Sequence, residues 1–243
     1  MSQGVNPSLL PLVFDAVTYR VGDESLLGPL DLEIEETNKT VILGPNGAGK
    51  SLLLRLAHGL LEPSAGEVRW ASASDVGLRA RQAMVFDHAV LLRRSARANV
   101  EYGLALRGIS REVRRERART VLERTGLGAI ADRSARALSA GEQQRLALAR
   151  AWALEPEVLF LDEPTASLDP AASRRVEELI ESIAATGTKI VMTTHQLGLA
   201  RRVADEVVFL HRGQLVERSD AGAFFTGPAT EEARAFLAGD LLW

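Results

Sequence analysis

The sequence predicts an α/β protein with a mostly parallel β-sheet, an antiparallel β flank and an inserted helical subdomain. Short apolar runs separated by helical patterns predict the parallel strands, because strands buried on both faces are apolar throughout. Two segments near the N-terminus alternate apolar and polar residues, which is typical of half-buried strands. No strand-like run occurs between residues 88 and 155, so we expect that stretch to be helical.

The antiparallel flank is predicted from Leu12 to Arg20 and from Leu30 to Glu36, where apolar residues alternate with polar ones. The first core strand, Thr40 to Leu43, runs into a glycine-rich turn, and the apolar spacing of residues 52 to 57 predicts a helix after it. The other predicted core strands are Ala83 to Phe86, Val158 to Leu161, Ile190 to Thr193 and Val207 to Leu210.

Helical spacing covers the insertion and the C-terminal end of the chain. The predicted helices are Arg97 to Arg107, Arg111 to Thr125, Glu142 to Ala153 and Glu231 to Ala238. We therefore expect one domain, with a core of residues 1–87 and 155–243 and a helical subdomain of about 88–154. The arginines between 111 and 119 are interleaved with Glu112 and Glu116, which favours a solvated helix face over a nucleic-acid patch.

Composition narrows the function classes. With 29 Lys and Arg against 32 Asp and Glu, the net charge of −3 gives no indication of a nucleic-acid partner. The absence of cysteine excludes disulfides, thiolate metal sites and cysteine nucleophiles, and it fits a reducing compartment. No segment approaches the ~18 consecutive apolar residues of a membrane span, and the N-terminus lacks a signal-peptide pattern. We expect a cytoplasmic chain that does not itself cross a membrane.

A glycine-rich loop lies between the strand at 40–43 and the helix after it. Its residues, Gly44, Pro45, Asn46, Gly47, Ala48, Gly49, Lys50 and Ser51, match the pattern G-x-x-x-x-G-K-[ST]. Glycines let backbone N–H groups converge on phosphate oxygens at a helix N-terminus, whose dipole favours anions. Lys50 is then expected to reach the β- and γ-phosphates, and the Ser51 hydroxyl to ligate Mg²⁺. The loop thus predicts a site for magnesium and a nucleoside triphosphate, with ATP the expected nucleotide.

Two carboxylates end the predicted strand at 158–161. Beside a phosphate loop, Asp162 is expected to hold Mg²⁺, and Glu163 to polarise the attacking water as a general base. An ordinary acidic turn before Pro164 is the structural alternative.

The stretch 138–145 reads Leu-Ser-Ala-Gly-Glu-Gln-Gln-Arg, and with it the chain resembles the ATP-binding cassette (ABC) family across nearly its whole length. The family's LSGGQ sequence corresponds to Leu138, Ser139, Ala140, Gly141 and Glu142, with departures at Ala140 and Glu142. Ser139 and Glu142 also have the spacing of a helix capping box. Both interpretations can hold, because a capped helix N-terminus presents N–H groups to a phosphate. The resemblance implies a P-loop NTPase fold with a RecA-like core.

Further residues match the family pattern in chain order. Tyr19 resembles the aromatic residue that stacks on adenine, and His195 the switch histidine that contacts the γ-phosphate and the attacking water. Alone, they would be an ordinary strand tyrosine and a structural histidine. Ser167 and Asp169 correspond to the family's loop across a dimer interface. The resemblance implies that two cassettes face head to tail, with each nucleotide between one chain's Lys50 loop and the other chain's Ser139 motif. A homodimer is expected, with a paralogous pair as the alternative.

Asp87 departs from the family, which has a glutamine after residues corresponding to Met84, Val85 and Phe86. A carboxylate keeps an oxygen ligand for Mg²⁺ but adds negative charge near Asp162 and Glu163. The alternative is that Asp87 points to solvent and plays no part.

The family contains several kinds of ATPase. Without its own membrane segments, the chain resembles the ATPase subunit of importers, whose permease and extracytoplasmic solute-binding protein are separate polypeptides. Residues 90–95 and 99–104 resemble ATPases of oxyanion importers, and residues 233–240 with Trp243 resemble those of tungstate-type importers. The resemblance implies tungstate or molybdate as the solute, with phosphate or another small solute as alternatives. A non-transport ABC ATPase acting on DNA or ribosomes is disfavoured because Leu138 follows Asp87 by only 51 positions, too few for a long coiled-coil insertion. A nucleotide kinase would leave residues 138–145 without a role.

Overall fold

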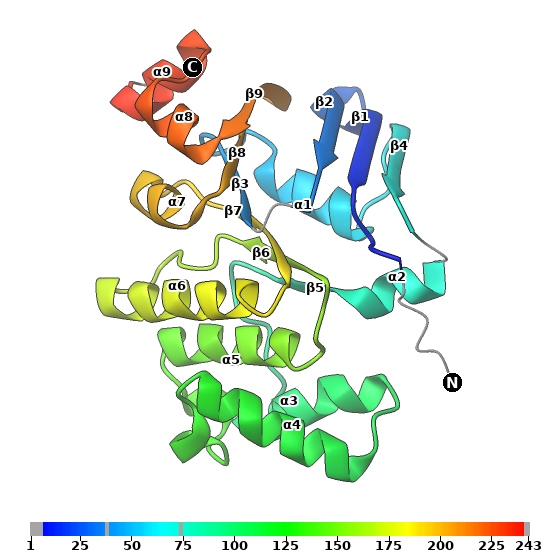
Figure 1. Ribbon diagram of the computed structural model, residues 1–243, viewed down its shortest axis with the longest axis vertical. Coiled ribbons are helices and arrows are strands. Elements are labelled where there is room, and N and C mark those ends of the chain that lie inside the picture. The colour runs from blue at the N-terminus through cyan, green and yellow to red at the C-terminus, as the bar shows by residue number, and fades with distance from the viewer. Residues whose placement is uncertain (1–6, 37–38, 73–74, 241–243) are drawn as a thin grey trace. The chain divides into compact units, whose positions relative to one another are not determined.

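The structure is a computed structural model that describes residues 7–36, 39–72 and 75–240. The chain forms two compact units (Figure 1): residues 1–81 with 191–243, called here the first unit, and residues 82–190, the second unit. Strand β7 (Lys189–Thr193) carries the chain from the second unit back into the first. Within the described residues, no helix is long and apolar enough to span a bilayer.

The first unit contains an antiparallel sheet in the order β2-β1-β4, formed by β1 (Leu12–Val21), β2 (Glu24–Ile34) and β4 (Ala65–Trp70). Central strand β1 pairs Leu12 with Ile34 on one side and with Trp70 on the other. This confirms the predicted antiparallel flank. Strand β2 begins earlier than predicted and ends before Glu36, while β4 was not predicted, because its residues are mostly exposed and lack an apolar run.

The first unit also contains β3 (Lys39–Leu43), which pairs parallel with β8 (Glu206–His211), and β9 (Gln214–Asp220), which returns antiparallel to β8. Its helices are α1 (Lys50–His58), α2 (Asp75–Arg81), α7 (Leu197–Val203), α8 (Ala221–Thr226) and α9 (Glu231–Ala238). Helix α1 buries Leu53, Leu54 and Leu56 and ends at Gly59 in the left-handed conformation that commonly stops a helix.

The second unit combines two parallel strands with four α-helices. Strands β5 (Gln82–Val85) and β6 (Val158–Asp162) pair from Gln82 opposite Val158 to Val85 opposite Leu161. The helices are α3 (Ala96–Leu106), α4 (Arg111–Arg124), α5 (Ala140–Trp152) and α6 (Pro170–Ala184), with short 3₁₀ turns at Gly128–Ile130 and Ala135–Ala137. Residues 86–157, all described, form no strand beyond one isolated bridge, so the helical stretch predicted there is confirmed.

Helix α4 carries the interleaved charges that predicted a solvated face. The Arg119 guanidinium pairs with Glu116 at 2.6 Å and with Glu123 at 3.3 Å, and all three side chains are exposed. These pairs satisfy the charges within one helix, as the solvated-face interpretation predicts.

Candidate functional site

The glycine-rich loop leaves strand β3 and enters helix α1 in the first unit. Gly44 has φ +153°, and a Cβ there would lie 2.2 Å from the Leu210 carbonyl oxygen of β8. Gly49 precedes α1 at φ +97°, where a Cβ would lie 2.8 Å from the Leu27 side chain of β2. Glycine is required at Gly44 because a Cβ would collide with backbone, and it is favoured at Gly49 because other residues rarely adopt that positive φ.

Lys50 lies inside this loop. Its side chain is buried, and its ammonium donates to the carbonyl oxygens of Gly44 at 2.9 Å and Pro45 at 3.1 Å. The first turn of α1 contains no acidic residue. A fixed ammonium and a helix N-terminus together form a cradle that favours a phosphate group.

The turn between β8 and β9 is hydrogen-bonded to the glycine-rich loop. This contact could not be predicted from the sequence. The Gly213 N–H donates to the Ala48 carbonyl at 3.2 Å, and the Gly213 carbonyl accepts from Gly28 at 2.7 Å. A Cβ at Gly213, φ +73°, would lie 2.7 Å from the Leu26 carbonyl oxygen. The Arg212-Gly213 turn is visible in sequence, but its contact with the loop arises only in the folded chain.

His195 and Tyr19 belong to the same unit as the loop. The Thr194 N–H donates to the Ile42 carbonyl of β3 at 3.2 Å, so exposed His195 follows directly beside the strand end from which the loop starts. Half-buried Tyr19 pairs across β1 and β2 with Leu27, the residue that packs against Gly49. Both predicted residues thus lie on elements that border the loop.

The acidic strand end lies in the second unit. Asp162 ends β6 and is 2% exposed, and half-buried Glu163 follows it at φ +46°. A residue other than glycine with a positive φ is strained by about 1–2 kcal/mol, and such strain is concentrated at functional sites. Because β5 and β6 are parallel and in register, Asp87 and Glu163 follow their C-terminal ends at the same sheet edge. The Asp87 carboxylate is half-exposed and lies 3.6 Å from Nε2 of His88.

Ser139 caps helix α5 in the second unit. Its hydroxyl accepts from the Glu142 N–H at 3.3 Å, and the Glu142 carboxylate accepts from the Ser139 N–H at 2.7 Å. This confirms the predicted capping box. The hydrogen bond from the Ser139 N–H holds the pKa of Glu142 below its usual value.

Two predicted motifs line one cavity of about 290 Å³ within the second unit. Ser139, Gly141 and Glu142 come from the start of α5, and Ser167 and Asp169 from the loop before α6. A Cβ on Gly141 would lie 2.7 Å from the Ala172 Cβ, so the first turns of α5 and α6 are in close contact. Asp169 also caps α6 by accepting from the N–H groups of Ala171 and Ala172, each at 2.9 Å.

The residues present suit Mg²⁺ and a triphosphate. Backbone N–H groups and an ammonium suit the phosphates, and hydroxyl and carboxylate oxygens such as those of Ser51 and Asp162 suit Mg²⁺, which prefers oxygen ligands. Within residues 7–36, 39–72 and 75–240, no three His, Asp or Glu side chains are arranged to hold a metal by themselves. Magnesium is commonly bound by one or two protein ligands together with substrate phosphates.

Comparison with known proteins agrees with this chemistry. The model of the ABC transporter family matches residues 27–166. The phosphate import ATP-binding protein PstB 2 of Natronomonas pharaonis is 34% identical, over 96% of this chain and 88% of its own. The glutamate transport ATP-binding protein GluA of Corynebacterium efficiens is 35% identical, over 88% of this chain and 93% of its own.

A solved structure is also similar: the ATP-binding cassette MJ0796, a dimer in a post-hydrolysis state bound to ADP and Pi. Its TM-score is 0.76 and its identity is 30%, over 86% of this chain and 98% of its own. The protein therefore belongs to the ABC transporter family and is an ATPase that binds ATP with Mg²⁺.

Proposed function

We propose that the protein is the ATP-hydrolysing subunit of an ABC importer. The main observation behind this proposal is the buried Lys50 in the loop of residues 44–51. The chain is also 34–35% identical to import and transport ATP-binding proteins over most of its length. Hydrolysis would energise a separate permease.

We assign nucleotide binding to the first unit. Tyr19 stacks on the adenine, and the N–H groups of Gly44 to Ser51 surround the phosphates. Lys50 exchanges its two backbone carbonyl acceptors for β- and γ-phosphate oxygens, which bear more charge. Ser51 holds Mg²⁺ through its hydroxyl.

Hydrolysis also needs a metal ligand and a base. Asp162 and Asp87 would supply carboxylate oxygens to Mg²⁺, and the ion would neutralise phosphate charge. Glu163 accepts the proton of the attacking water, and His195 donates to the γ-phosphate. The left-handed backbone of Glu163 supports its role, since strained conformations of this kind cluster at functional sites.

A second copy of the chain is the proposed partner in hydrolysis. The N-terminus of α5, with Ser139, Ala140, Gly141 and Glu142, contacts the nucleotide held by the other copy, and Ser167 and Asp169 lie in the interface. The two motifs line one cavity, which supports a joint role in binding the other copy. The dimer of MJ0796 supports this arrangement by analogy.

The remaining partners are a transmembrane permease and, through it, an extracytoplasmic solute-binding protein. The ATPase would be cytoplasmic, at the inner face of the cell membrane. We propose a small oxyanion as the solute, because residues 90–95 and 99–104 resemble oxyanion importers and residues 233–240 resemble tungstate-type importers. Trp243, which is part of the second resemblance, lies outside the described residues. The relative from Natronomonas pharaonis also imports an oxyanion, phosphate. An amino acid is the second candidate, since GluA is equally similar.

Two measurements test this assignment. Co-purification from detergent-solubilised membranes should recover a polytopic protein with the tagged chain, and recovery of ribosomes or DNA instead would contradict an importer. Calorimetry on the system's binding protein with tungstate, molybdate, phosphate and glutamate should show binding only for oxyanions. Binding of glutamate alone would replace the oxyanion with an amino acid.

A further inference from the structure

The loop of residues 88–95, here the linking loop, follows Asp87 and is held by helix α5. Nη1 of Arg150, in the last turn of α5, donates to the Val90 carbonyl at 2.9 Å. The arginine is half-buried, and its Cγ would lie 3.5 Å from a Cβ at Gly103 of α3. The arginine stem therefore lies against α3 while its head holds the linking loop.

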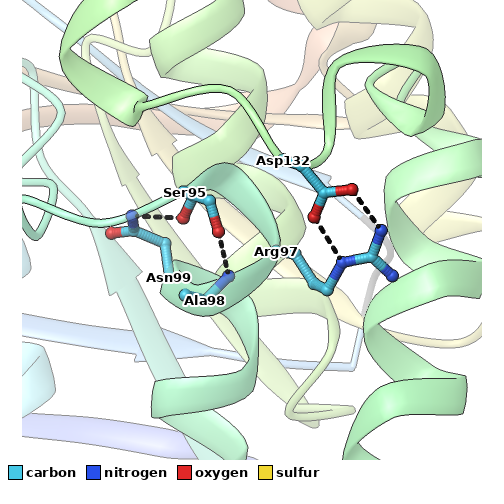
Figure 2. A network of polar contacts seen from close by, with 5 residues as sticks. All are labelled: Ser95, Arg97, Ala98, Asn99 and Asp132. Atoms are coloured by element: carbon cyan, nitrogen blue, oxygen red, sulfur yellow. Dashed lines mark hydrogen bonds and ion pairs between the residues drawn. The ribbon is translucent and has the colours of Figure 1, made fainter.

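Asn99, in the first turn of α3, holds the other end of the linking loop. Its side chain is fully buried; Oδ1 accepts from the Leu92 N–H at 2.8 Å, and Nδ2 donates to the carbonyls of Leu92 and Ser95 at 3.2 and 2.9 Å. The Ser95 hydroxyl caps α3 by accepting from the Ala98 N–H at 3.2 Å (Figure 2). The amide satisfies loop carbonyls and an N–H group that would otherwise be costly to bury.

The end of the linking loop is also bonded to the segment 131–135, which leads to Ser139. The Ala96 N–H donates to the Arg133 carbonyl at 3.0 Å, and the Ala135 N–H to the Arg94 carbonyl at 2.9 Å. Arg97 and Asp132 add a two-point ion pair with both contacts at 3.0 Å, visible in Figure 2. The loop and the start of the Ser139 motif are thus held together at several points.

These contacts close a ring inside the second unit. The linking loop is hydrogen-bonded at its end to residues 131–135, and from there the chain continues to Ser139 and along α5 to Arg150. The hydrogen bond from Arg150 to the Val90 carbonyl leads back to the linking loop. A helix of this length is stiff, and Ser139 and Arg150 are about 16 Å apart at the usual rise per residue. The linking loop is therefore connected to the start of α5 by two routes, through residues 131–135 and through α5 itself.

We propose that Arg150 is a positioning residue for ATP hydrolysis, because it makes the linking loop and the Ser139 end of α5 move as one body. The inference rests on the proposed function for its effect on turnover. Losing the bond leaves the phosphate loop intact, so ATP binding persists while the Ser139 motif is held less accurately. Small misplacements of groups around a reacting centre cost large factors in rate.

The test uses Arg150→Met, which keeps the apolar stem but removes the donor, and Arg150→Lys, which restores one. We expect Arg150→Met to lower kcat at least about tenfold with KM for ATP within about twofold, and Arg150→Lys to recover most of kcat. Arg234→Met is the matched control, because Arg234 also donates to backbone carbonyls, those of Pro228 and Ala229, but in the first unit. An unchanged kcat in Arg150→Met, or an equal fall in Arg234→Met, would overturn the proposal.

Amide hydrogen exchange without nucleotide separates this inference from the proposed function. Arg150→Met should speed exchange in residues 88–95 and also in residues 139–144, whereas Arg234→Met should change neither. Faster exchange confined to residues 88–95 would make Arg150 a local tether only and would overturn the coupling. Absence of ATP hydrolysis by the unmodified chain would contradict the proposed function, while the exchange result would still decide whether the two segments are linked.

Discussion

Lys50 carries the chemistry of the phosphate loop. Its buried ammonium already lies on two backbone carbonyls, so little freedom is lost when phosphate oxygens replace them. We expect Lys50→Ala to weaken ATP affinity at least about tenfold, since a charge-assisted contact is removed from a buried site. Titration with a fluorescent ATP analogue measures this. Lys39→Ala is the control, because it removes a lysine of the same unit that pairs with Asp205 at 3.8 Å. Equal affinity in Lys50→Ala and Lys39→Ala would refute the site.

Asp87 gives a prediction specific to this chain. A carboxylate at the sheet edge beside Asp162 and Glu163 adds a negative charge that bound Mg²⁺ compensates. We therefore expect the ATPase rate of the unmodified chain to depend more steeply on Mg²⁺ than that of Asp87→Gln. Magnesium titrations at fixed pH and saturating ATP should show the native curve shifted to higher Mg²⁺. Superimposable curves would mean that Asp87 faces solvent without effect.

Individual residues show which features could be predicted from the sequence and which could not. Gly44, Lys50, Asp162 and Ser139 could be identified because a contiguous pattern states their chemistry. Gly213 could not, since its role depends on contact with Ala48, 165 positions earlier in the chain. The contacts of Arg150 and Asn99 could not be predicted for the same reason: their partners are loop carbonyls, which carry no sequence signal.

At the scale of elements, Glu217 fastens helix α9 to strand β9. The residue is 8% exposed. Its carboxylate accepts from the N–H groups of Ala229 and Thr230, at 3.0 and 2.9 Å, and from the Thr230 hydroxyl at 2.8 Å. Burial alone would raise the pKa of Glu217, but these hydrogen bonds outweigh it and hold the pKa below its usual value.

This lowered pKa predicts a pH-dependent stability. A carboxylate whose folded pKa lies below its unfolded value stabilises the protein above the unfolded pKa, and that stability is lost as pH falls through the folded pKa. We expect Glu217→Gln to cost roughly 2 kcal/mol of unfolding free energy at pH 7, because two or more charge-assisted bonds are weakened. Urea unfolding at pH 7 and below about pH 4.5 should show the gap between the two proteins narrowing in acid. A gap independent of pH would contradict the assignment.

Strands with a buried apolar run or a regular apolar–polar alternation were predictable, and strands with neither pattern were not. Strands β3, β6, β7 and β8 each contain four or more buried residues, so their sequences show the run directly. Strands β4 and β9 are polar and mostly exposed or half-buried, and they form because a neighbouring strand offers unpaired backbone groups. Their sequences alone resemble loops.

At the scale of the whole molecule, hydrolysis is proposed to require two copies of the chain. Glu163→Gln removes the base but preserves shape, so ATP should bind and hold two copies together without turnover. Size-exclusion chromatography of this variant should show a dimer with Mg²⁺ and ATP and a monomer with ADP. A monomer under both conditions would contradict the paired arrangement.

Phosphate release by the purified chain with saturating Mg²⁺ and ATP tests the central claim most directly. We predict steady turnover by the unmodified protein and a fall of about 100-fold or more in Glu163→Gln, the range expected when a general base is lost. No phosphate release by the unmodified protein, or the same rate in Glu163→Gln, would contradict the account of this chain as an ABC ATPase with Glu163 as its base.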